Sequence, residues 1–160
     1  MSTKPTVEYV TFQVAGQTLG IPVQEVVEVL PEQTIALVPL APRAVAGLLN
    51  LRGQIVTAID VRRKLALKDQ ASGSAHMNIV VSHRAELFSL VVDSVGDVMT
   101  MEQEAFGEPP ATLSAEWKSC CTGVYRMKRG LLVVINVSAL VDFERQEEPK
   151  THDNTKGVVA

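Results

Sequence analysis

The stretch Gly47-Leu-Leu-Asn-Leu-Arg-Gly53, followed by Gln-Ile-Val-Thr-Ala-Ile-Asp60, decides the fold because its pattern occurs twice. The second copy is Gly123-Val-Tyr-Arg-Met-Lys-Arg-Gly130, followed by Leu-Leu-Val-Val-Ile-Asn136. Each copy contains a glycine, an apolar segment, an Arg-Gly turn, an apolar strand and an Asp or Asn placed to cap a short helix. The copies lie 76 residues apart, from Gly47 to Gly123. Such a repeat predicts two related small units in one chain.

A hairpin pattern repeats in the same way. Apolar residues alternate with polar ones over Val10–Val14, and after a short turn the pattern resumes at Leu19–Val23. About 69 residues later, Ile79–Ser82 and Leu87–Val92 form a second pair of apolar runs around a turn. Each pair is typical of a β-hairpin, so both halves of the chain are expected to contain the same hairpin.

Other segments give single local signals. Thr34–Leu40 predicts a strand that ends among prolines, and Arg43–Leu49 predicts a helical turn. Asp60 is placed to cap one short helix, and Ser114 to cap another that ends near Cys121. The overall expectation is a mainly β chain with a few short helices.

Composition supports this expectation and excludes other classes. The 160 residues include 24 valines and 6 isoleucines but only 4% aromatic residues, which favours many short strands. The net charge of −3 gives no general attraction to nucleic acid or to an anionic membrane. No apolar run is long enough to span a bilayer, and Met1–Thr6 lacks the apolar segment of a signal peptide. These features, and the absence of a disulfide framework, favour a cytoplasmic protein.

The sequence contains few residues arranged for catalysis. No phosphate-binding glycine loop or serine-nucleophile motif is present, and His76, His83 and His152 lack metal-ligand spacing. We therefore predict no catalytic residue, no metal and no cofactor. Two alternatives stay open: a small enzyme that uses Cys121, and a nucleic-acid-binding barrel, for which Arg62-Arg63-Lys64 would supply positive charge.

The turn Asn50-Leu51-Arg52-Gly53 places a charged side chain between two apolar segments. In the simplest interpretation it is a hairpin tip, with Gly53 at positive φ and Arg52 in water. Alternatively, the planar guanidinium of Arg52 binds a carboxylate or a backbone carbonyl of a partner.

These residues resemble the CheW-type chemotaxis coupling proteins. The resemblance is carried by Ile21–Val29, by the Asn50–Gly53 turn with its flanking segments and by Val91–Val98, and it extends from about Glu8 to Phe143. It implies two five-stranded, SH3-like β-barrels that are related by a pseudo-twofold axis and packed together. We thus predict a single domain over residues 8–143, with flexible tails at 1–7 and 144–160. The boundary between its subdomains is expected near residues 70–76, with an exchange of strands between them left open.

The resemblance also implies a function. Proteins of this family are non-catalytic cytoplasmic scaffolds at membrane-associated receptor arrays. They couple the cytoplasmic tips of chemoreceptors (methyl-accepting chemotaxis proteins) to the regulatory domain of a CheA-type histidine kinase, with no nucleic acid and no insertion into the membrane. A related alternative is an adaptor of another chemosensory system, such as pilus motility. The receptor-binding residues implied by the resemblance are Val23, Val26, Glu28, Gly47, Asn50, Arg52 and Gly53. The candidates for kinase binding are Ile35 and Ile55.

Overall fold

The computed structural model describes residues 4–71 and 73–142. Among these residues, none of the helices has the length and apolar character needed to cross a bilayer. The helices are η1 (Val23–Glu25), α1 (Val61–Lys64), η2 (Gln103–Ala105), α2 (Ala115–Cys120) and α3 (Val137–Val141). The strands are β1 (Thr6–Val14), β2 (Gln17–Pro22), β3 (Val26–Pro31), β4 (Val45–Leu51), β5 (Gln54–Asp60), β6 (Met77–His83), β7 (Glu86–Val92), β8 (Ser94–Glu102), β9 (Cys121–Met127) and β10 (Gly130–Ile135).

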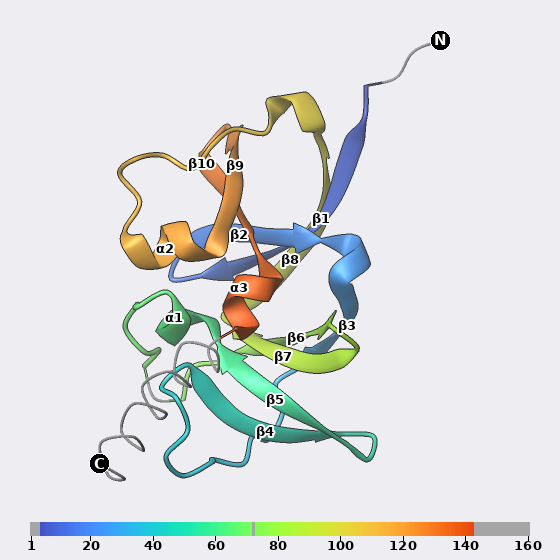
Figure 1. The fold of residues 1–160 in the computed structure, drawn as a ribbon, viewed down its shortest axis with the longest axis vertical. Helices are drawn as coiled ribbons and strands as arrows, with labels where there is room; N and C mark the ends of the chain where they lie inside the picture. The colour runs from blue at the N-terminus through green and yellow to red at the C-terminus, as the bar shows by residue number, and fades with distance from the viewer. Residues whose placement is uncertain (1–3, 72, 143–160) are drawn as a thin grey trace, which may run out of the picture.

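The strands form two five-stranded sheets, which confirms the predicted mainly β fold (Figure 1). The first sheet has the order β8-β1-β2-β10-β9 and occupies the upper part of Figure 1. The second has the order β3-β6-β7-β5-β4 and lies below it, with α3 between the two sheets. The two orders correspond strand for strand, since each sheet contains two antiparallel hairpins joined through one parallel pair, β2 with β10 and β5 with β7.

Each sheet combines strands from both halves of the chain. The β1–β2 hairpin joins β8, β9 and β10, whereas the β6–β7 hairpin joins β3, β4 and β5. The segment 70–76, near which we expected the boundary between the subdomains, connects α1 to β6 within the second sheet. The two halves exchange hairpins, and local sequence patterns do not contain this long-range pairing.

Two further predictions differ from the structure. Arg43–Leu49 is not a helical turn, because Val45–Leu51 pairs with β5 as strand β4. Thr34–Leu40 is not a strand either, and only Ala36 forms an isolated bridge. The prolines at its end lack the N–H that a sheet ladder needs.

The limits of the domain also differ slightly from the prediction. Strand β1 begins at Thr6, so the first sheet includes two residues that we assigned to the N-terminal tail. Residues 1–3 of the predicted N-terminal tail and all of the predicted C-terminal tail, 144–160, lie outside the described residues.

The predicted helix caps are confirmed. The Asp60 carboxylate accepts the Arg63 N–H at the start of α1, and the Ser114 hydroxyl accepts the Trp117 N–H at the start of α2. Asn136 plays the same part for α3. These contacts span three residues, so local sequence is sufficient to encode them.

The core is shared between the sheets. A large apolar cluster contains side chains from both sheets and from α3. In β10, for example, Val133 and Ile135 face this cluster, whereas Leu132 and Val134 face a smaller one with Tyr9. The period of two places both faces of the central strands against apolar side chains, and the shared cluster binds the two sheets into one unit.

One glycine in each sheet, Gly47 or Gly123, allows that sheet to bend back on itself. Ala36, just after edge strand β3, exchanges two backbone hydrogen bonds of 2.8 Å with Leu48 of the opposite edge strand β4. Gly107, after β8, makes the same exchange with Val124 of β9, at 2.8 and 2.9 Å. A Cβ on Gly47 would lie 2.7 Å from Cγ2 of Ile35 and closer still to the Ala36 carbonyl oxygen. A Cβ on Gly123 would lie 2.6 Å from the Gly107 carbonyl oxygen.

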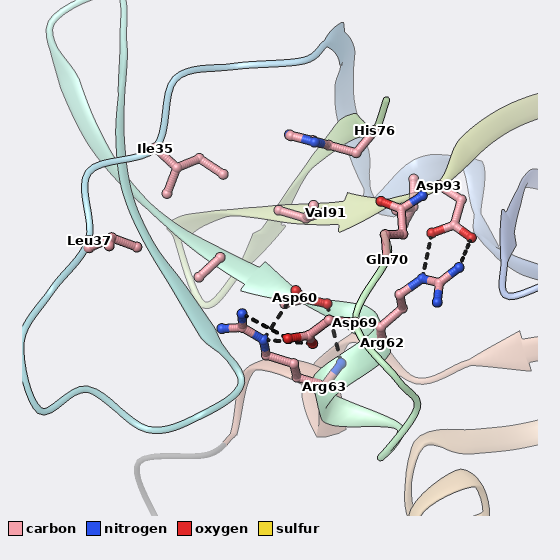
Figure 2. A pocket seen from close by; sticks show the side chains of 12 residues that line it. Ile35, Leu37, Asp60, Arg62, Arg63, Asp69, Gln70, His76, Val91 and Asp93 are labelled. Carbon is pink, nitrogen blue, oxygen red and sulfur yellow. Dashed lines mark hydrogen bonds and ion pairs between the residues drawn. The ribbon is translucent and has the colours of Figure 1, made fainter. Parts of the chain in front are cut away.

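A carboxylate ties the two sheets together at their junction. Asp93, between β7 and β8, accepts from Nε and Nη2 of Arg62 at 2.9 and 2.6 Å (Figure 2). It also accepts the backbone N–H of Ala15, in the β1–β2 turn of the other sheet, at 2.8 Å. The Arg62 guanidinium holds the pKa of Asp93 below its usual value, although partial burial acts in the opposite direction.

Replacement of Gly47 by alanine should open the second sheet. Because the new Cβ would meet the backbone of Ala36 and the φ of Gly47 is +148°, we expect Gly47→Ala to lower the free energy of unfolding by about 2–4 kcal/mol. Gly16→Ala is the matched control, since its φ of +78° is also positive but nothing lies within 4 Å. This control should cost only about 1–2 kcal/mol. Equal midpoints in urea for the two variants would contradict the proposed contact.

Asp93→Asn should weaken the junction in a pH-dependent way. A carboxylate with a lowered pKa stabilises the fold above its ordinary pKa of about 3.9, and this contribution is lost as the pH falls below it. We expect a loss of about 1–3 kcal/mol at neutral pH, which shrinks toward zero as the pH falls below about 4. Denaturation curves at several pH values test this, with Asp97→Asn, an exposed carboxylate of β8, as the control. A difference that stays constant down to the lowest pH would contradict the role of the charge.

Candidate functional site

The Asn50–Gly53 turn is a rigid hairpin tip between β4 and β5. Arg52 and Gly53 both have positive φ, +51° and +88°, as a two-residue type I′ turn requires. The Asn50 side-chain oxygen accepts the Gly53 N–H at 2.7 Å and fixes the turn from inside. Leu49 and Leu51 point into the small cluster of the second sheet, so the alternation of the strand directs Asn50 to the surface.

Arg52 reaches across the sheet to Glu28. Its Nη2 donates to the Glu28 carboxylate on β3, the edge strand at the opposite end of the second sheet. This hydrogen bond lowers the pKa of Glu28 and raises that of Arg52. The Arg52 side chain nevertheless remains 67% exposed. The guanidinium has five N–H donors, so the pairing orients it and leaves other donors directed at solvent.

The structure brings the other predicted receptor-binding residues only partly to the Asn50–Gly53 turn. Val23 lies in η1 and lines a shallow pocket with residues of β1 and β8. Val26 begins β3 and packs against the shared core while staying partly exposed. Gly47 is buried beneath Ala36 and Ile35, so its part is to close the sheet rather than to touch a partner.

The two predicted kinase-binding residues differ in exposure. Ile55 lies on β5 opposite Asn50 and is 63% exposed. Ile35 lies over Gly47 and packs against the cluster of the second sheet, so it is only partly exposed. Ile35 therefore offers a partner only part of its side-chain surface.

Sequence reasoning missed other exposed apolar side chains. Val27 and Val29 lie on the outer face of β3, on either side of Glu28, at 51% and 38% exposed. Leu37 and Leu40 are exposed in the segment between β3 and β4. The alternation within β3 could have identified the two valines, because Val26 and Leu30 take the inner face.

A second candidate site is a pocket between α1, the 65–76 segment and the chain after β3 (Figure 2). Its charged side chains pair with one another. Arg62 pairs with Asp93, and Arg63 donates from Nε to Asp69 at 3.1 Å and lies 3.5 Å from Asp60. The basic run at Arg62 and Arg63 is therefore largely neutralised within the fold, which disfavours its use as a nucleic-acid platform.

The cysteines are poorly placed for nucleophilic chemistry. Cys120 is buried in the shared core, and the Cys121 thiol donates to the Gly123 carbonyl at 3.3 Å. Burial raises the pKa of both thiols, which opposes formation of the reactive thiolate. Within residues 4–71 and 73–142, no cluster of His, Cys, Asp or Glu could hold a metal ion.

Comparison with known proteins agrees with this arrangement. The model of the CheW-like domain matches residues 8–145. The chain is 25% identical to the chemotaxis protein CheW of Treponema pallidum, over 83% of this chain and 81% of that protein. It is 26% identical to CheW of Klebsiella aerogenes, over 86% and 82% of the two chains.

A solved structure has the same fold. The scaffolding protein TtCheW of Thermoanaerobacter tengcongensis superposes with a TM-score of 0.73 and 22% identity, over 82% of this chain and 90% of that one. The family model covers most of the chain, and the two sheets have the corresponding architecture. The chain therefore belongs to the CheW-like domain family.

Proposed function

We propose that this protein is a non-catalytic chemotaxis adaptor that couples chemoreceptors to a CheA-type histidine kinase. The observation that carries the proposal is the exposed, oriented Arg52 on a rigid turn in a chain of the CheW-like family. The adaptor would act in the cytoplasm at receptor arrays. By binding two partners at once, it would raise their effective concentration and shift the conformational equilibrium of the kinase.

The receptor site is centred on Arg52 and Glu28. The remaining N–H donors of Arg52 suit a carboxylate or a helix-terminal carbonyl of the receptor tip. Val23 and Val26, both partly exposed, would supply the apolar contacts of a helix lying in a groove, while Asn50 and Gly53 hold the turn in shape. In this division the apolar residues provide affinity and the guanidinium provides orientation.

The kinase site is centred on Ile55. This side chain stands exposed on β5 near the same hairpin tip. An exposed isoleucine on a strand is suited to pack against an apolar face of the kinase regulatory domain. Ile35 contributes at most its partly exposed surface, since its inner side covers Gly47.

Arg52→Asp tests the receptor site. Aspartate tolerates the positive φ of this turn better than most residues, so we expect a folded variant whose Kd for a receptor-tip fragment rises at least about tenfold. Arg84→Asp is the matched control, because Arg84 is also exposed, at φ +53°, in the β6–β7 turn. Calorimetric titration measures both. Unchanged affinity for Arg52→Asp, or an equal loss in the control, would refute the assignment.

Ile55→Asp tests the kinase site. Because the side chain is exposed, the variant should fold normally while its affinity for the CheA regulatory domain falls at least about tenfold. Receptor binding should remain within a factor of about two of the parent. Val98→Asp, at an exposed valine of β8 in the other sheet, is the control. Kinase affinity that survives Ile55→Asp but not Val98→Asp would place the kinase on the other sheet.

A further inference from the structure

The tip of the β9–β10 hairpin concentrates positive charge. Arg126, Lys128 and Arg129 lie within four residues, and all three side chains are exposed. In the part of the chain that the structure describes, none of the three forms an ion pair. Like charges on neighbouring exposed residues raise the positive potential at this tip.

The corresponding hairpin of the other sheet is neutralised. There Arg52 pairs with Glu28 of the edge strand β3. Edge strand β8 holds the place of β3 in the other sheet, and Asp97 precedes Val98, which pairs with Val10 of β1, as Glu28 precedes Val29, which pairs with Ile79 of β6. Asp97 forms no ion pair with the β9–β10 hairpin or with any other described residue. The same scaffold thus contains an internal counter-ion in one half and leaves the positive charge unbalanced in the other.

A cavity adjoins this basic tip. Its lining is largely apolar and includes Pro110, Val124 and Leu131, the last lying directly opposite Arg126 on the neighbouring strand. Arg126 and Glu108 are its charged members. The cavity is therefore suited to an uncharged apolar side chain, whereas the excess positive charge lies beside it at Lys128 and Arg129.

We propose that the β9–β10 hairpin is a docking site for a short acidic segment of a protein partner. Carboxylates of this segment would pair with Arg126, Lys128 and Arg129, and an apolar side chain between them would enter the adjoining cavity. This surface is separate from the Arg52 and Ile55 sites and lies on the other sheet, so it adds a third contact to the proposed adaptor.

A short segment fits the charge distribution better than a long polyanion. The whole chain has a net charge of −3, with 18 acidic against 15 basic residues. A nucleic acid or an anionic membrane would extend beyond the hairpin and meet the acidic remainder of the surface. A peptide of a few residues interacts only within about one Debye length and is attracted by the local patch. The tip also lacks an aromatic residue on which a base could stack.

The test is an NMR titration of the isotope-labelled full chain with a short synthetic peptide of repeating Glu-Leu-Glu. We expect the amide signals of the β9–β10 hairpin to shift on addition of the peptide, and the affinity to fall as salt is added. A Gln-Leu-Gln peptide of equal length should produce no shifts at the hairpin. Absence of shifts at the hairpin with the acidic peptide would overturn the proposal.

Charge-reversed variants separate a local site from general attraction. Arg126→Glu, Lys128→Glu and Arg129→Glu combined should weaken peptide binding at least about tenfold. The control combines Lys68→Glu, Arg84→Glu and Lys118→Glu, which alters net charge equally at exposed positions elsewhere and should retain affinity within about a factor of two. An equal loss in both variants would overturn the proposal.

Tighter binding of a single-stranded oligonucleotide or of phosphatidylserine vesicles than of the peptide would overturn the choice of a protein segment. Because none of these measurements involves a receptor or a kinase, their failure would leave the proposed adaptor function untouched.

Discussion

The closure of each sheet over a glycine is the constraint on which the rest of the structure depends. A five-stranded sheet leaves two unpaired edges, and here the chain that leaves one edge strand pairs with the strand at the opposite edge. The bridges Ala36–Leu48 and Gly107–Val124 can form only because Gly47 and Gly123 have no side chain at the crossing. Ile35 and the ring of Phe106 then cover the two glycines, so closure also positions apolar side chains at the end of each sheet.

Closure brings together Glu28 and Arg52, the centre of the proposed receptor site. Glu28 lies on edge strand β3 and Arg52 in the turn after the opposite edge strand β4, so a flat sheet would hold them far apart. In the bent sheet they form an ion pair that holds the guanidinium in one orientation while most of it faces solvent. The exchange of hairpins and the shared core make the support rigid, and a site on rigid strands loses little conformational entropy when a partner binds.

The sequence predicted features that depend on local or repeated patterns. The two copies that begin at Gly47 and Gly123 revealed two related units, and the caps at Asp60 and Ser114 were correct because each contact spans three residues. Arg43–Leu49 was wrongly assigned as a helical turn because pairing with β5, rather than local propensity, makes its later part a strand. The exchange of hairpins and the Glu28–Arg52 pair connect distant segments, and a single sequence contains no local signal for either.

Internal symmetry makes the differences between the halves informative. Both sheets have the same strand order, the same glycine closure and the same capped helix after the second strand of the repeat. These shared features satisfy the requirements of folding, so folding does not explain why one hairpin tip has a counter-ion and the other does not. Unbalanced charge at an exposed tip adds nothing to packing in the core. Its position beside an apolar cavity is therefore best explained by contact with another molecule, as expected for an adaptor whose function resides in its surfaces rather than in a catalytic centre.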